Sequence, residues 1–136
     1  MTEGTIFIWI IVSVIFLLVF LYYVPLILWI VAKTAGINVS LLQLFLIRLR
    51  NIPPTKIVNC MILAYKAGLK DITILLLQAH HLAGGNIENV ITALIMAKNA
   101  NVDLTVKQAF TFDLAGKDVL QAVREKIKKS NSASSL

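Results

Sequence analysis

Residues 5–32 form one uninterrupted apolar stretch, TIFIWIIVSVIFLLVFLYYVPLILWIVA, which contains no Asp, Glu, Lys, Arg or His. A helix needs about 20 apolar residues to cross roughly 30 Å of hydrocarbon, so the stretch is long enough to span a bilayer. In water such a helix would have no polar face, and a chain of 136 residues could hardly bury it on all sides. The stretch therefore predicts a transmembrane helix rather than a core helix.

Two tryptophans suggest where a span of this kind meets the membrane surfaces. Trp9 and Trp29 are 20 residues apart, which corresponds to about 30 Å along a continuous helix. Indole side chains are enriched at both interfaces, so this spacing would place one in each. We predict a span over about residues 6–24, followed by a kinked continuation.

Tyr22, Tyr23 and Pro25 leave a second interpretation open. Proline cannot donate to the helical ladder and disfavours helix at the residue before it, so a kink or break is expected near Pro25. The anchor would then comprise residues 1–35. In the alternative, the span ends at the tyrosines and residues 26–32 lie along the interface.

The distribution of charge predicts the orientation. Only Glu3 and the terminal amine precede the span, whereas several basic residues follow it closely: Lys33, Arg48, Arg50 and Lys56. The positive-inside bias places the N-terminus outside and the C-terminal part in the cytoplasm. A cleaved signal peptide fits poorly, because the apolar run is too long and no basic region precedes it.

The net charge of +6 has a simple explanation beside a membrane anchor. The basic residues are dispersed and are not interleaved with exposed aromatic residues, so the pattern does not predict nucleic-acid binding. Attraction to anionic lipid headgroups explains the same charge. Cys60 is the single cysteine and cannot form an internal disulfide, which agrees with a reducing cytoplasm.

Residues 36–54 contain a second apolar block, whose continuous part of about 11 residues is too short to span a bilayer. Its narrow polar edge favours an amphipathic helix in the interface, with Leu42 and Phe45 in lipid and Arg48 and Arg50 reaching the phosphates. A re-entrant segment and a core helix remain the alternatives. Pro53 and Pro54 end the block.

Residues 55–129 predict a small cytoplasmic bundle of about five short helices, and residues 130–136 predict a disordered tail. The chain is thus expected to be an all-α membrane protein. The third short helix begins at an Asn86 cap and carries a strong apolar stripe at helical spacing. Because a domain of this size is near the lower limit for covering such stripes by itself, we predict self-association through them. The alternative is that the same residues close a monomeric bundle. The stripe consists of Ile87, Val90, Ile91, Leu94 and Ile95.

A weak internal repeat runs through this part. The sequence LAGG at residues 82–85 recurs as LAGK at residues 114–117, and each copy precedes an Asn or Asp cap and a new helix. A helix-turn-helix unit used about twice would give a small α-solenoid or bundle.

The pattern offers no support for catalysis or for a cofactor. His80 and His81 are adjacent, so they diverge by about 100° on a helix and cannot both face one ion; structural roles are favoured over metal binding. Cys60 has no activating partner nearby in sequence. Gly84 and Gly85 lack the strand and the Lys-Ser/Thr pair of a phosphate loop. We therefore predict no enzyme activity, no metal and no cofactor.

An ordered set of motifs resembles a known family. RLR-x-IPP-x-KIVN, KAGL, HLAGGN and DLAGKDVL together are similar to the amino-terminal region of bacterial flotillin-like proteins of the FloA type. The resemblance implies a non-enzymatic, self-assembling scaffold of membrane microdomains on the inner face of the cytoplasmic membrane. Cys60 stands where the family usually has proline. The family continues into a band-7 (prohibitin-like) domain that this sequence lacks, so we expect a truncated piece or a short natural member.

Two hypotheses for the function follow. The first is a membrane-anchored scaffold that forms homo-oligomers and contacts anionic headgroups. The second is an accessory subunit or immunity-type protein that contacts a membrane partner through its helices. The residues predicted to lie at the membrane interface are Trp9, Tyr22, Tyr23, Trp29, Lys33, Leu42, Phe45, Arg48 and Arg50.

Overall fold

The computed structural model describes residues 2–23 and 26–135. Within these residues the chain is all-helical, as the sequence predicted, with eight helices and no strand. The helices fall into two compact units, Met1–Asn51 and Ile52–Leu136. Val24 and Pro25, where the sequence predicts a kink, lie outside the described residues.

The first unit contains α1 (Thr2–Tyr23), α2 (Leu26–Thr34) and α3 (Leu41–Leu49). No residue of α1 is buried, whereas α2 and α3 contact each other and bury apolar side chains. Ser40 begins α3 with a capping box: its side chain pairs with the backbone of Gln43, and the Gln43 side chain accepts from the Ser40 N–H at 3.2 Å. This reciprocal cap explains why the helix starts there.

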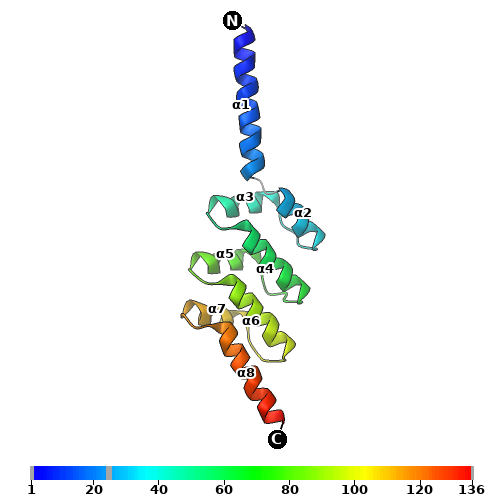
Figure 1. Ribbon diagram of the computed structural model, residues 1–136, viewed down its shortest axis with the longest axis vertical. Helices are drawn as coiled ribbons and strands as arrows, with labels where there is room; N and C mark the ends of the chain where they lie inside the picture. The colour runs from blue at the N-terminus through cyan, green and yellow to red at the C-terminus, as the bar shows by residue number, and fades with distance from the viewer. Residues whose placement is uncertain (1, 24–25, 136) are drawn as a thin grey trace. The chain divides into compact units, whose positions relative to one another are not determined.

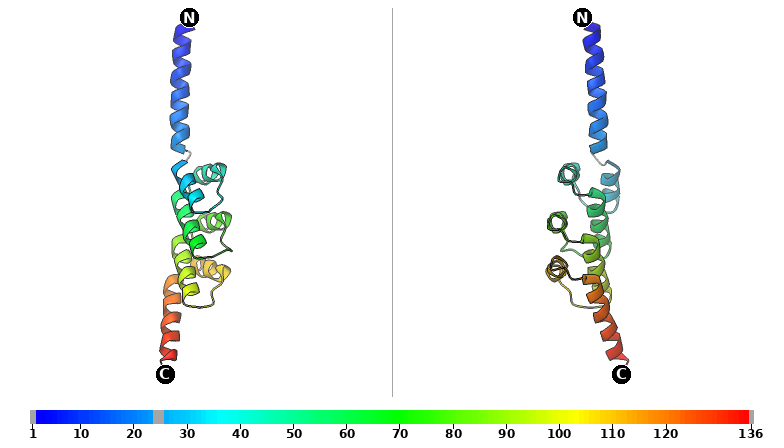
Figure 2. Two further views of the ribbon diagram at one scale, coloured as in Figure 1. Left: turned by 90° about the vertical axis from the view of Figure 1, so that its right-hand side faces the viewer. Right: turned by 60° about the vertical axis from the view of Figure 1, so that its left-hand side comes forward.

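The second unit contains α4 (Pro54–Lys66), α5 (Ile74–Leu82), α6 (Ile87–Asn99), α7 (Val106–Leu114) and α8 (Val119–Ser134). Figure 1 shows α4, α6 and α8 side by side, and Figure 2 shows α5 and α7 on one side of that row. These are the five short helices that the sequence predicted. The core lies between the two layers and is formed mainly by α6, which packs against α4, α5, α7 and α8.

The same type of turn ends more helices than the repeat in the sequence suggested. In three places the backbone carbonyl of a buried helical alanine accepts a hydrogen bond from the N–H five residues later. This is the 6→1 bond of a Schellman motif. The three bonds join Ile37 to Ala32, Leu69 to Ala64 and Val102 to Ala97, at 3.0, 2.9 and 2.8 Å. This turn follows α2, α4 and α6, so the first unit carries one copy of it and the second unit carries two. The LAGG and LAGK turns follow α5 and α7 instead, and each has a 6→1 bond of its own, from the Gly85 N–H to His80 and from the Lys117 N–H to Phe112, both at 3.0 Å.

At each of these turns the residue after the helix has a positive φ, which explains why glycine or asparagine occupies that position. Asn101, with a φ of 53°, stands where the earlier loops have Gly36 and Gly68. Asparagine tolerates the left-handed conformation better than other non-glycine residues, so it can substitute here.

The end of the chain differs from the prediction. Residues 130–136 were expected to be disordered, yet α8 is helical to Ser134. Asp118 caps the start of α8 by accepting from the Gln121 N–H at 3.1 Å. Once a helix is nucleated, each further residue adds one hydrogen bond at little cost, so small polar residues can extend it.

Candidate functional site

The most exposed apolar element in the structure is α1. It has 22 residues, none of them buried, and its side chains from Ile6 to Tyr23 are almost all large and apolar. Among the described residues, one helical region, beginning at Thr2, is long and apolar enough to cross a membrane. Such a surface would be strongly unfavourable in water, so its natural surroundings are lipid.

Aromatic and basic side chains pair at the C-terminal end of this region. The Lys33 ammonium lies 4.7 Å from the Trp29 ring centroid, and the Arg48 guanidinium lies 5.1 Å from that of Tyr22. A second tyrosine, Tyr23, is 6.0 Å from the same guanidinium. These cation–π pairs combine the residue types that are enriched at membrane interfaces. Five of the nine predicted interface residues are therefore brought into contact pairwise.

The remaining predicted interface residues occupy more separate positions. Trp9 is exposed on α1, and Arg50 is exposed at the end of α3. Leu42 and Phe45 line an apolar groove of the first unit together with residues of α1 and α2. The groove is lined by Phe16, Val19, Phe20, Tyr23, Leu26, Leu41, Leu42, Phe45 and Leu49.

The helix α3 combines features of two of the three interpretations drawn for residues 36–54, the core helix and the interfacial helix. Leu44 and Ile47 are fully buried, as in a core helix. Leu42, Leu46 and Leu49 are exposed on another face, as in an interfacial helix. This helix is therefore a packed element that also presents a row of leucines, and its contact with lipid stays a prediction.

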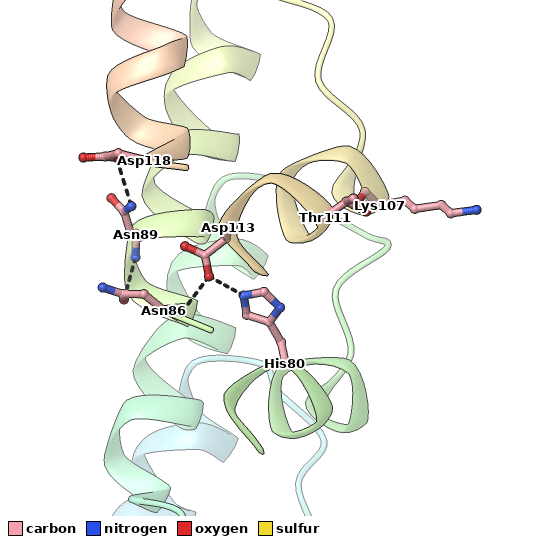
Figure 3. Close-up of polar contacts among 7 residues, drawn as sticks. All are labelled: His80, Asn86, Asn89, Lys107, Thr111, Asp113 and Asp118. Carbon is pink, nitrogen blue, oxygen red and sulfur yellow. Dashed lines mark hydrogen bonds and ion pairs between the residues drawn. The ribbon is translucent and has the colours of Figure 1, made fainter. Parts of the chain in front are cut away.

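A buried polar link joins α5, α6 and α7 in the second unit (Figure 3). One oxygen of Asp113, Oδ2, lies 2.7 Å from His80 Nε2 and accepts from the Asn86 backbone N–H at 2.7 Å. Because a carboxylate only accepts, the proton lies on Nε2. The His80 and Asp113 side chains are only 1% and 9% exposed. Asp113 thus ties the end of α5 to the start of α6.

The surroundings of His80 hold its ring in one position. The ring stacks on Phe110 with centroids 4.2 Å apart, and a Cβ at Gly85 would overlap it. The second ring nitrogen, Nδ1, is buried without a hydrogen-bond partner among the described residues. With the proton on Nε2, this atom is an acceptor, so no buried N–H is left unpaired.

This arrangement agrees with the structural role that the sequence favoured for His80. The partner, Asp113, lies 33 residues away, so no local spacing could have indicated it. The only hint in the sequence was the repeat, which places α5 and α7 in equivalent positions. His81 is half-buried on a different side of α5. Within the described residues, no group of three or more His, Cys, Asp or Glu could hold a metal ion.

Two further groups have shifted pKa values, each for a structural reason. Burial raises the pKa of the Cys60 thiol to about 11, and the negative charge of Glu88 adds to the shift while Lys56 opposes it. Hydrogen bonds from the Asn89 side chain and the Gln121 backbone lower the pKa of Asp118. Cys60 is thus a neutral core thiol at physiological pH, and Asp118 is an ionised helix cap.

The apolar stripe predicted to mediate self-association lies in the core of the second unit. Ile87, Val90, Ile91 and Leu94 are buried, and Ile95 is half-buried. The helix that carries them, α6, is the central element and packs against helices on several sides. A closed unit was the alternative considered for these residues, and their burial agrees with it. Self-association itself stays a prediction, but it would need another surface.

These observations define a class: an all-helical membrane protein in which an apolar N-terminal helix precedes a small helical-repeat unit. The chain belongs to the flotillin-like protein FloA family, whose sequence model matches residues 6–131. The resemblance noted from its motifs is therefore confirmed. No solved structure matches the chain.

The relatives are bacterial proteins called flotillin-like protein FloA. The one from Bacteroides thetaiotaomicron is 54% identical over 112 residues, which cover 82% of this chain and 34% of the relative. The one from Dictyoglomus turgidum is 48% identical, covering 87% of this chain and 36% of the relative. The one from Staphylococcus aureus strain Newman is 43% identical, covering 84% and 34%. This chain therefore spans about a third of the length of the relatives it matches.

Proposed function

We propose that this chain is a non-enzymatic scaffold module that anchors a helical-repeat unit at the inner face of the bacterial cytoplasmic membrane and associates with further copies of itself. The observation that carries the proposal is α1, a 22-residue apolar helix without a buried residue. Membership of the flotillin-like family supports the same role. The helices from Pro54 to Ser134 would then be the part that meets other molecules.

The proposed orientation rests on charge. The part of the chain that precedes the span carries Glu3 and no Lys or Arg, whereas all 13 basic residues follow it. Basic residues near the end of a span favour the cytoplasmic side. Lys33 and Arg48, which lie against aromatic rings, would meet the phosphates of the inner leaflet.

The non-enzymatic role is supported by the position of the histidine–carboxylate pair. His80 and Asp113 have the right distance for a catalytic dyad, but both side chains are enclosed by the second unit. A general base has to reach a substrate proton directly or through one water. The Asp113 carboxylate accepts the Asn86 N–H at the start of α6, and the His80 ring stacks on Phe110. Both contacts stabilise the fold.

Thiol labelling in spheroplasts tests the orientation. In a Cys60→Ala background, a Glu3→Cys variant should react with a membrane-impermeant maleimide without permeabilisation. A Gln121→Cys variant, exposed on α8, should react only after permeabilisation. Labelling of Gln121→Cys in sealed spheroplasts would contradict the proposed topology.

The size of the extracted protein tests the scaffold. We expect homo-oligomers larger than a dimer after mild detergent extraction, measured by sedimentation velocity with the detergent contribution subtracted. A stable one-to-one complex with a different membrane protein would instead indicate an accessory subunit, and a monomer at all concentrations would contradict self-association.

A further inference from the structure

The apolar groove of the first unit lies between the C-terminal part of α1 and one face of α3. Its volume is about 580 Å³, within the range of about 300–1,000 Å³ that is common for ligand pockets. α1 contributes aromatic residues such as Phe16 and Phe20 to one wall, and α3 contributes Leu42 and Phe45 to the other. The surface of the groove is apolar throughout. The groove is therefore large enough for a ligand, and it offers that ligand no hydrogen bond.

The position of the groove along α1 places it within one leaflet of a bilayer. Phe16 and Tyr23, the first and last α1 residues of its wall, are seven residues apart, which corresponds to about 10 Å along the helix. One leaflet contributes about half of the roughly 30 Å of hydrocarbon, so the groove follows about two-thirds of its depth. The acyl chains of that leaflet run in the same direction as the groove.

The chemistry of the walls favours a hydrocarbon chain over a segment of polypeptide. An extended peptide would bring N–H and C=O groups into the groove, and an apolar wall within hydrocarbon would leave them unpaired at a large cost. An acyl chain carries no such group. Phe16, Phe20 and Leu42 are 71%, 51% and 64% exposed, so the groove is open to the lipid around it.

A second copy of α1 is a poorer occupant because of its shape. A helix with its side chains is about 10–12 Å across, and membrane helices approach one another closely along faces of small residues. Between Ile6 and Tyr23, Ser13 is the one small residue of α1, so the helix presents large side chains on all sides. Such a helix would cover the mouth of the groove without filling it, whereas a single chain of methylene groups can enter.

A positive group stands at the end of the groove that is nearest the membrane surface. Arg48 of α3 is half-buried, and its guanidinium lies 5.1 Å and 6.0 Å from the ring centroids of Tyr22 and Tyr23. Tyr23 is itself part of the groove wall, at the end of α1. A guanidinium that stacks on a ring uses its flat face, so the N–H donors in its plane can bind a phosphate.

No acid of the first unit competes for these donors. The one acid of this unit, Glu3, lies near the other end of α1. Within the described residues, Arg48 forms neither an ion pair nor a side-chain hydrogen bond. A lipid phosphate at the membrane surface would supply the acceptor that the protein itself does not provide.

We propose that the groove binds one phospholipid of the bilayer, with an acyl chain between α1 and α3 and the phosphate on Arg48. The inference rests on the proposed function, because α1 has to be in the membrane for lipid to reach the groove. The depth and the apolar walls select a hydrocarbon chain, and Arg48 selects a lipid that has a phosphate. The bound lipid fills the space between the two helices and holds the anchor against α3.

Quenching of tryptophan fluorescence by brominated lipids tests the site in the full chain. Trp9→Phe with Trp29→Phe removes both natural tryptophans, and Phe20→Trp or Phe45→Trp then reports from one wall of the groove each. Leu18→Trp, at the same depth on the far side of α1, is the matched control. The protein is reconstituted at low protein-to-lipid ratio in phosphatidylcholine vesicles. These vesicles contain a fixed share of either brominated phosphatidylcholine or brominated diacylglycerol with the same chains.

We expect the two brominated lipids to quench Leu18→Trp equally, because the open face of α1 meets all lipids alike. Both groove reporters should show about a tenfold preference for phosphatidylcholine, the ratio that one charge-assisted hydrogen bond supplies. Arg48→Gln should abolish this preference, whereas Arg50→Gln, which removes a charge from the end of the same helix, should leave it unchanged. Because neither lipid carries a net charge, general attraction to basic residues does not produce such a difference.

Three outcomes would overturn the inference, and a fourth concerns the anchor alone. Equal quenching by the two lipids at both groove reporters would show that the groove has no phosphate-dependent site. A preference that survives Arg48→Gln would remove this arginine from the site. Weak quenching by both lipids that strengthens as the protein is diluted in lipid would identify a second copy as the occupant. In contrast, Leu18→Trp that neither lipid quenches would place α1 outside the bilayer and contradict the proposed function.

Discussion

Asp113 illustrates how a single residue acquires a role through distant parts of the chain. Its carboxylate accepts hydrogen bonds from the ring of His80 and from the backbone at Asn86, which belong to α5 and to the start of α6. When a buried N–H donor loses its acceptor, the folded state is destabilised by the full desolvation free energy of that donor. This one side chain therefore holds three helices in register.

We predict that Asp113→Ala destabilises the second unit by about 1–3 kcal/mol, because it leaves the His80 N–H without an acceptor. Thermal unfolding of the detergent-solubilised protein, followed by circular dichroism, measures the effect. Asp103→Ala, in an exposed loop, is the control and should change stability by less than about 0.5 kcal/mol. Equal effects of the two substitutions would argue against the link.

Gly85 provides an independent test of the same packing. A methyl group there would overlap the His80 ring, so Gly85→Ala should be destabilising in the natural sequence. In a His80→Ala background the ring is absent, and the same change should cost little. Additive effects in this double-mutant cycle would show that the two residues do not interact.

The Cys60 thiol should make stability depend on alkaline pH. Its pKa is raised from 9.0 to about 11 by burial, so the folded state retains a proton that the unfolded state loses. Stability from this group is fully present below about pH 9 and declines as the pH rises towards 11. The melting temperature should fall more over this range than in Cys60→Ala; equal falls would contradict the assignment.

At the scale of helices, α3 shows how one element can serve two environments. Its buried and exposed leucines alternate around the helix, with Leu44 inside and Leu42 outside. The sequence alone left interfacial, re-entrant and core interpretations open, because leucine suits lipid and protein interiors equally well. Packing decided that this helix has an inner face, which periodicity on a nearly all-apolar helix could not reveal.

Leu44→Ala and Leu42→Ala form a matched pair that separates the two faces of α3. We expect Leu44→Ala to destabilise the protein by about 2–5 kcal/mol, since it opens a cavity in a filled core. Leu42→Ala should leave the stability of the detergent-solubilised protein within about 0.5 kcal/mol of the natural value. Chemical denaturation in one detergent gives both numbers, and equal losses would place both side chains in the core.

At the scale of the whole molecule, the question is which surface brings copies together. α1 has no glycine or alanine after Gly4, and Ser13 is the one small residue within its apolar run, so it lacks the small-xxx-small face that lets membrane helices pack closely. The apolar stripe of α6 is buried, which leaves exposed apolar residues such as Leu63 on α4 as the available contacts.

We predict that copies crosslink through the second unit rather than through α1. In a Cys60→Ala background, Asn59→Cys, one turn before Leu63, should give dimers and larger ladders on oxidation. Ile11→Cys and Ile15→Cys in α1 should give few, and Leu63→Glu should suppress the Asn59→Cys ladder. Efficient crosslinks in α1 with none at Asn59 would reverse the assignment.

The sequence by itself determined the features that depend on local physical chemistry. An uncharged apolar run of this length identifies the anchor, since hydrocarbon thickness sets the number of residues. Capping residues such as Asn86, Thr105 and Asp118 located helix starts, because each accepts a nearby backbone N–H. The ordered motifs were enough to indicate the family.

Only the tertiary structure decided which side chains face one another. The partner of His80 is 33 residues away, and the apolar stripe on α6 became core because helices from both layers surround it. Leu75, Leu82 and Leu114 on α5 and α7 look like core residues in the sequence but remain exposed, since the layer they belong to has a second face. Burial and pairing are properties of the packed chain, and hydrophobicity alone does not distinguish a leucine that faces the core from one that faces lipid.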